Sequence, residues 1–143
     1  MSKIAIGGDH AGFFYKENLK KYLVSKGHEV TDFGPDSAES ADYPDYVHPA
    51  SEAIEKGDCE FGILICGTGN GVNITANKHQ KVRSALCWNT DLAALARQHN
   101  DANVICFAAR FIAYEYVEKM TDIFVETPFE GGRHQRRVDK ISC

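Results

Sequence analysis

The chain has 143 residues, a length that fits one domain with an ordinary hydrophobic core. It is 43% hydrophobic and 25% charged, as soluble globular proteins are, and its formal net charge of −4 argues against general nucleic-acid binding. No apolar run approaches the length of a membrane span, and the N-terminus lacks a signal-peptide pattern. We therefore expect a cytoplasmic protein with neither a membrane nor a nucleic acid as its partner.

Strands and helices alternate along the whole chain. Strands are predicted at 3–8, 28–33, 61–65, 82–88 and 103–108, and helices at 11–26, 45–56, 72–78, 91–99 and 111–126, with a short basic helix after Pro128. In the helix at 91–99, Leu92, Leu95 and Ala96 are expected to face inward. This alternation predicts a three-layer α/β/α sandwich with a parallel sheet, in one domain over residues 1–143 with a basic segment at 131–143.

The stretch from Phe61 to Asn77 carries the strongest chemical signal. An apolar run predicts a buried strand that ends at Cys66, and a helix follows the next turn. That turn comprises Gly67, Thr68, Gly69, Asn70 and Gly71. Glycines let backbone N–H groups approach an anion, and a helix N-terminus favours both an anion and a thiolate. The alternative interpretation is a tight turn beside a buried, inert cysteine.

Other polar residues follow strands at the same predicted edge of the sheet. Asp9 and His10 follow the first strand and Arg110 follows the fifth, and ligands of such sheets bind at the carboxyl ends of strands. Asp9 and His10 could position a sugar hydroxyl or a phosphate, although Asp9 could equally cap a helix. Tyr43 could reach a ligand from its loop, and core packing explains it as well.

A second set of polar residues lies late in the chain. Arg133 and Arg137 are four residues apart, so on a helix they share a face and could clamp a phosphate. A solvated basic tail is the alternative. His99 and Asn100 end a predicted helix, where a histidine is also an ordinary favourable cation.

The cysteines and histidines give no metal-binding pattern. The five cysteines (Cys59, Cys66, Cys87, Cys106 and Cys143) contain no C-x-x-C pair, which indicates reduced thiols, as in a cytoplasm. The six histidines include no H-E-x-x-H motif or clustered ligand set. We therefore expect no metal and no cofactor.

Four motifs, GGDHAG, ICGTGNG, RQHNDANV and EGGRHQRRV, occur in that order over essentially the whole chain. Together they resemble the B-type ribose-5-phosphate isomerases, which belong with the galactose-6-phosphate isomerase subunits of the lactose pathway. The resemblance implies a metal-free enzyme that interconverts ribose 5-phosphate and ribulose 5-phosphate. It also implies a five-stranded parallel sheet ordered 2-1-3-5-4, and a homodimer or a dimer of dimers.

The resemblance also assigns roles to residues. Cys66 matches the catalytic base and His99 the residue that opens the furanose ring, and the Thr68 hydroxyl could help to hold the developing oxyanion. The ligand-binding positions are matched by Asp9, His10, Gly67, Gly69, Asn70, Gly71, Asn100, Arg110, Arg133 and Arg137. Asn70 and Asn73 are more polar than expected in this turn, which leaves a six-carbon sugar phosphate open as the substrate. A flavodoxin-like module that binds a phosphate or nucleotide without chemistry is the alternative from another class.

Finally, the order of the elements predicts a site that is shared between subunits. Cys66 follows a strand, whereas His99 precedes one, so the two residues are expected at opposite edges of their own sheet. If both act on one substrate, one of them comes from a neighbouring subunit.

Overall fold

A computed structural model describes residues 1–143. Its sheet has five strands: β1 (Lys3–Gly8), β2 (Glu29–Asp32), β3 (Phe61–Cys66), β4 (Ser84–Leu86) and β5 (Val104–Ala108). All neighbouring strands are parallel, and their order is β2-β1-β3-β5-β4. The predicted sheet and its strand order are therefore confirmed.

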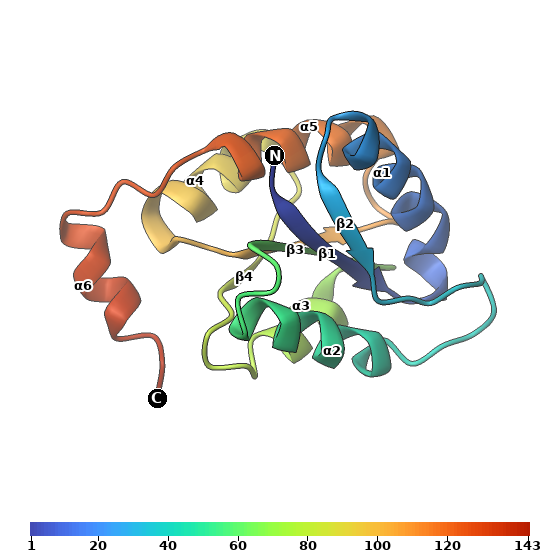
Figure 1. The fold of residues 1–143 in the computed structure, drawn as a ribbon, viewed down its shortest axis with the longest axis horizontal. Coiled ribbons are helices and arrows are strands. Elements are labelled where there is room, and N and C mark those ends of the chain that lie inside the picture. The colour runs from blue at the N-terminus through green and yellow to red at the C-terminus, as the bar shows by residue number, and fades with distance from the viewer.

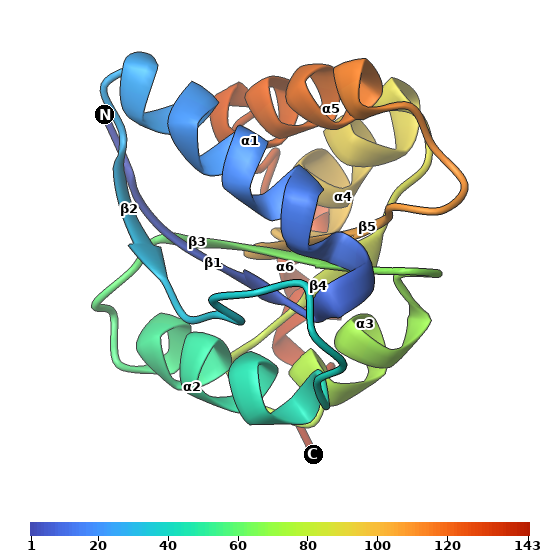
Figure 2. The same ribbon diagram turned by 90° about the vertical axis from the view of Figure 1, so that its right-hand side faces the viewer.

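Helices cover both faces of this sheet (Figures 1 and 2). They are α1 (Phe13–Ser25), α2 (Pro44–Glu55), α3 (Asn70–Ala76), α4 (Thr90–Asn100), α5 (Tyr114–Glu126) and α6 (Arg133–Asp139), with a 3-10 turn, η1, at His10–Gly12. Helices α1, α4 and α5 lie over one face, and α2 and α3 lie over the other. Helix α6 stands apart from these layers at the end of an extended segment, beside α4, and none of its residues is buried (Figure 1). None of the helices is both long and apolar enough to cross a membrane.

Alternate residues of the central strands feed two separate hydrophobic cores. Ile63 and Ile65 of β3 pack beneath α1, α4 and α5, whereas Leu64 and Cys66 pack against α2 and α3. All six residues of β3 are buried. A strand that is covered on both faces holds its carboxyl end rigidly, which fixes the position of Cys66.

Three expectations about individual elements were wrong. The fourth strand covers only Ser84–Leu86, and it begins late because the Val82 N–H closes a turn onto the carbonyl of His79 and the Arg83 N–H donates to the Asn103 side chain. Helix α5 begins at Tyr114 rather than Phe111, because the N–H groups of Phe111 and Ile112 both bond the carbonyl of Ala108 in a turn. Leu95 is exposed, and α4 buries Ala93, Ala96 and Arg97 instead.

Arg97 replaces apolar packing on α4 because its charge is satisfied there. Its Nη1 donates to the Ala102 carbonyl and to Asp101, and its Nε donates to the Thr127 carbonyl at 3.1 Å. The guanidinium also lies over the Phe61 ring, 5.2 Å from its centroid. Arg97 thereby ties the segment that follows α5 to the end of α4.

A buried ion-pair network holds the carboxyl end of β2. Lys16 is fully buried, and its Nζ lies 2.8 Å from Asp32 and 2.8 Å from Glu17. Lys20 donates to the same Asp32 oxygen at 2.8 Å, and the other Asp32 oxygen accepts the Gly34 N–H. Burial opposes ionisation of Asp32, but the hydrogen bonds from both lysines keep its pKa below the ordinary value.

We expect Asp32→Asn to lower the free energy of unfolding by about 3 kcal/mol, the lower end for breaking a buried ion pair, because Glu17 still pairs with Lys16. Urea unfolding measures the change. Because the pKa of folded Asp32 is depressed, its contribution is present above the unfolded pKa and is lost as the pH falls through the folded pKa. The difference between wild type and variant should therefore shrink in acid. Asp36→Asn, at an exposed position nearby, is the matched control, and equal losses in both variants would contradict this role.

Candidate active site

Cys66 opens a turn whose backbone donors are free. Its side chain is buried, with the residue 4% exposed at the end of β3. The N–H groups of Gly67, Thr68 and Gly69 have no acceptor within the chain, and the Thr68 hydroxyl accepts the Asn70 N–H at 3.2 Å. Unpaired N–H groups beside a thiol form a cradle that can hold an oxyanion.

Two glycines make this turn possible. Gly69 has a φ of +75°, and a Cβ there would collide with the side chain of Leu86. A Cβ at Gly71 would overlap the ring of Tyr43, so this phenol lies directly on the turn. The structure thus brings Tyr43 to the glycine turn, and α3 begins at Asn70, two residues earlier than predicted.

Asp9, His10 and Arg110 join the turn at the same edge of the sheet. The Asp9 N–H donates to the Ile65 carbonyl at 3.2 Å, and the Arg110 N–H donates to the Gly67 carbonyl at 3.1 Å. The Arg110 guanidinium packs against Gly67. These residues, with Tyr43, Cys66 and the turn Gly67–Gly71, are called the glycine-turn cluster below.

Within this cluster, Asp9 and His10 are held by backbone groups. One Asp9 oxygen accepts the N–H groups of Ala11 and Gly12 and so caps the 3-10 turn, as the alternative interpretation of Asp9 predicted. His10 Nδ1 accepts the Ala41 N–H at 3.1 Å, which leaves Nε2 to carry the proton of the neutral ring. Both residues line a pocket of about 530 Å³ that also includes Tyr43.

The remaining predicted residues gather in a second pocket, of about 400 Å³. Its lining residues are His99, Asn100, Arg133, His134 and Arg137. Helix α4 ends at Asn100, and α6 supplies the other three residues. We call this the histidine–arginine pocket.

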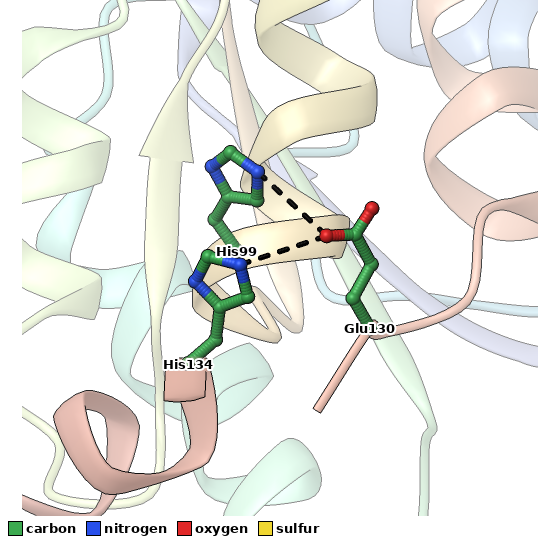
Figure 3. A group of neighbouring side chains, drawn as sticks. All are labelled: His99, Glu130 and His134. Carbon is green, nitrogen blue, oxygen red and sulfur yellow. Dashed lines mark ion pairs between the residues drawn. The ribbon is translucent and has the colours of Figure 1, made fainter. Parts of the chain in front are cut away.

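Sequence reasoning missed two members of this region, His134 and Glu130. The rings of His99 and His134 stack with centroids 4.3 Å apart, and Nε2 of each ring faces the Glu130 carboxylate (Figure 3). Burial, and then the nearby His99 and Arg133, hold the pKa of His134 below its ordinary value. Glu130 and His134 both lie in the motif EGGRHQRRV beside Arg133, and this was the sequence signal that could have pointed to them. No spacing rule, however, links them to His99.

The two groups lie at opposite edges of one sheet. The glycine-turn cluster follows the ends of β1, β3 and β5, whereas His99 and Asn100 precede the start of β5, whose Val104 pairs with Gly62 at the start of β3. A strand of this length spans roughly 17–20 Å. One subunit therefore does not bring Cys66 and His99 to the same small ligand.

Three of the other cysteines are unsuited to proton transfer. Burial raises the pKa of Cys59, that of Cys87 to about 12, and that of Cys106 above its ordinary value, so these thiols stay protonated at neutral pH. Cys143 is exposed at the C-terminus, and no cysteine forms a disulfide. Cys66, by contrast, ends β3 directly before the glycine turn and its free N–H donors.

The fold and these clusters define an α/β protein that is built to hold a small anionic metabolite at the edge of a parallel sheet. The chain belongs to the ribose/galactose isomerase family, whose profile matches residues 4–141. The resemblance predicted from the four motifs is therefore confirmed.

Named relatives match along nearly their whole length. Ribose-5-phosphate isomerase B of Escherichia coli is 44% identical over 143 residues, which cover 100% of this chain and 96% of the relative. The crystal structure of a ribose 5-phosphate isomerase from Thermotoga maritima has a TM-score of 0.97 and 49% identity, covering 99% of this chain and 97% of that one. The Mycoplasma genitalium isomerase, solved with bound ribulose-5-phosphate, has a TM-score of 0.92 and 43% identity, over 97% and 93% of the two chains.

Proposed function

We propose that this protein interconverts ribose 5-phosphate and ribulose 5-phosphate, as an aldose–ketose isomerase of type B. The observation that carries the proposal is the full-length similarity to ribose-5-phosphate isomerases B, at 44% identity to the Escherichia coli enzyme. The free N–H donors of the glycine turn beside Cys66 fit the chemistry that this reaction requires.

In the proposed reaction, Cys66 is the base. Its thiolate removes the proton from C2 of the open-chain aldose and returns it to C1, by way of an enediolate in which the O2 hydroxyl proton passes to O1. The N–H groups of Gly67, Thr68 and Gly69 and the Thr68 hydroxyl stabilise the oxyanion that develops. Asp9, His10 and Tyr43 line the adjoining pocket and hold sugar hydroxyls there. The neutral His10 presents a donor at Nε2, because its Nδ1 accepts the Ala41 N–H.

The histidine–arginine pocket supplies the opposite end of the site. His99 shuttles the proton that opens the furanose ring, and Arg133 and Arg137 bind the phosphate, with Asn100 beside them. Because this pocket lies at the other sheet edge of its own subunit, it must meet the Cys66 of a neighbour. We therefore propose a homodimer or a dimer of dimers, with the site shared between subunits. Arg110, from the subunit that supplies Cys66, lies against Gly67 of the glycine turn and contributes to ligand binding there.

We also propose that the protein works in the cytoplasm and that its reaction uses no metal or cofactor. Residues 1–143 act as one domain, and its basic segment 131–143 contributes to the active site of the neighbouring subunit. Five free cysteines support a reducing compartment. The position of α6, beside α4 and away from the other layers, supports a role at the partner (Figure 1).

A direct assay tests the proposed function. Ribose 5-phosphate is compared with allose 6-phosphate and galactose 6-phosphate, each with and without a chelator. We expect the largest kcat/KM for ribose 5-phosphate and no loss with chelator. A larger kcat/KM for a six-carbon substrate would overturn the pentose assignment. If none of the three turned over and the purified protein carried a chromophore, the non-catalytic module would be the better description.

Arg137→Ala is expected to weaken phosphate binding. Loss of one charge-assisted hydrogen bond costs about 1.5–3 kcal/mol, so KM should rise roughly 10- to 150-fold while kcat falls less. Inhibition by inorganic phosphate should weaken by a similar factor. Steady-state kinetics at constant ionic strength measures both effects.

Arg136→Ala is the matched control, because Arg136 neighbours Arg137 on α6, is exposed and does not line the pocket. It removes the same charge from the same helix, so its KM should stay near that of the wild type. Equal increases of KM in both variants would mean that Arg137 is part of a solvated basic surface and does not bind the phosphate.

A further inference from the structure

Three side chains around the histidine–arginine pocket are arranged like the ligands of a transition metal. His99 ends α4, His134 lies in the first turn of α6, and Glu130 lies in the segment that joins α5 to α6 (Figure 3). Their ligand atoms all lie within 4.8 Å of one another. Glu130 Oε1 is 3.8 Å from His99 Nε2 and 3.5 Å from His134 Nε2.

The backbone around these three residues is already fixed. The Glu130 N–H donates to the Gln98 carbonyl at 3.1 Å, next to His99, and the His134 N–H donates to the Gly131 carbonyl at 3.1 Å. The stacked rings, only 13° from parallel, present both Nε2 atoms to the same carboxylate oxygen. The end of α4, the segment that joins α5 to α6, and α6 itself thus bring the three side chains together through backbone hydrogen bonds, without a metal ion.

We propose that His99, Glu130 and His134 form a Zn²⁺ site, and that Zn²⁺ bound there inhibits the enzyme. Two imidazoles and a carboxylate are ligands that Zn²⁺ takes in open three-ligand sites, where a water fills the fourth position. In the tetrahedral geometry that Zn²⁺ takes, Zn–N and Zn–O bonds of about 2.0–2.2 Å place two ligand atoms roughly 3.3–3.6 Å apart. The 3.5 Å separation between His134 Nε2 and Glu130 Oε1 meets this spacing, and the 3.8 Å separation of His99 Nε2 from the same oxygen is slightly longer. Because the rings are stacked nearly parallel, the His99 ring must turn out of the stack before both nitrogens can bind one ion.

The surroundings set how tightly the ion binds. The His99 and Glu130 side chains are 43% and 51% exposed, so they can rotate and an ion can reach them, whereas His134, at 14%, is the fixed ligand. Arg133 and Arg137 line the same pocket and repel a cation. We therefore expect micromolar affinity, as for a regulatory site rather than a structural one.

Inhibition follows from the identity of one ligand, and this part rests on the proposed function. A His99 nitrogen that is bonded to Zn²⁺ has lost the lone pair that would accept a proton from the sugar. Ring opening should then stop, although Cys66 and the glycine turn are untouched.

A binding titration decides the site without reference to activity. In the 143-residue Cys143→Ser protein, which lacks the exposed thiol, Zn²⁺ is titrated against a chromophoric chelator. Glu130→Gln should weaken Zn²⁺ binding by about 10-fold or more, since loss of even an outer-shell partner of a metal site has that effect. His134→Gln should do the same. Glu126→Gln, at an exposed position four residues earlier, and His48→Gln, in a separate histidine pair, should leave the affinity unchanged.

Each outcome has a distinct meaning. No Zn²⁺ binding, or binding that is equal in the Glu130→Gln and Glu126→Gln proteins, overturns the site. If the site binds Zn²⁺ as expected, micromolar Zn²⁺ should inhibit isomerisation by the wild type, EDTA should reverse the inhibition, and Glu130→Gln should resist it. Turnover that persists with the site occupied overturns the inhibition and the role of His99 in ring opening, while the metal site itself stands.

Discussion

Replacing Cys66 with alanine is expected to lower kcat by roughly 10²- to 10⁴-fold, the usual contribution of a general base. Cys66→Ser should be almost as poor, because a serine hydroxyl of similar size is a much weaker acid and is not ionised at neutral pH. Binding of inorganic phosphate should survive in both variants, because Arg133 and Arg137 are unchanged. Steady-state kinetics and phosphate inhibition measure the two effects separately.

The control for this prediction is Cys59→Ala. Cys59 is 5% exposed, so this variant also truncates a buried cysteine, but it lies at a distance from the glycine turn and its pKa is raised by burial. It should keep near wild-type turnover. Thermal unfolding shows whether each variant remains folded. A folded Cys66→Ala protein with near wild-type kcat would mean that Cys66 is a buried, inert thiol.

Alkylation gives an independent reading of the same cysteine. In the Cys143→Ser protein, iodoacetamide should inactivate the enzyme by modifying Cys66, and ribose 5-phosphate should slow the inactivation. Peptide mass spectrometry identifies the modified thiol. Inactivation with Cys66 unmodified would contradict its role as the base.

Mixing two inactive variants is expected to restore activity. Cys66→Ala and His99→Ala subunits each lack one residue of the site, and in a dimer with shared sites every site takes one residue from each subunit. A mixed dimer therefore holds one site with both residues intact and one site with neither. Random pairing of equal amounts makes about half of the dimers mixed, so about a quarter of the wild-type activity should appear.

The experiment is run by unfolding and refolding the two variants together, with each variant refolded alone as the control. Differently tagged subunits allow the mixed species to be isolated and its composition verified. Each variant alone must be folded and inactive. If verified mixed oligomers then also stay inactive, the proposal that each site is shared between subunits is wrong.

The sequence by itself determined the fold class and one half of the candidate site. Apolar runs such as Phe61–Ile65 alternate with segments of helical periodicity, and this alternation predicts a parallel sheet that is covered by helices on both faces. In such a sheet every strand delivers the residue that follows it to the same edge. The sequence alone therefore predicts that Asp9, Cys66 and Arg110 lie together.

Local boundaries depended on tertiary contacts that no periodicity records. Arg97 is buried on α4 while Leu95 is exposed, because the guanidinium finds three backbone or carboxylate partners and a phenyl face. The fourth strand is short because the Asn103 side chain accepts the Arg83 N–H at 2.8 Å, so a side chain replaces part of the ladder. Thr127 and Asn103 lie far along the chain from Arg97 and Arg83, so these pairings are decided only on folding.

The tertiary structure alone decided what surrounds His99. The resemblance supplied His99, Arg133 and Arg137 one by one, but the stacking of His99 on His134 and the approach of Glu130 arise because Arg97 and Gln98 anchor the segment after α5 to the end of α4. A single helix places residues by its own period. A pocket built from a helix end, a connecting segment and a separate short helix has no period, so only the folded chain reveals it.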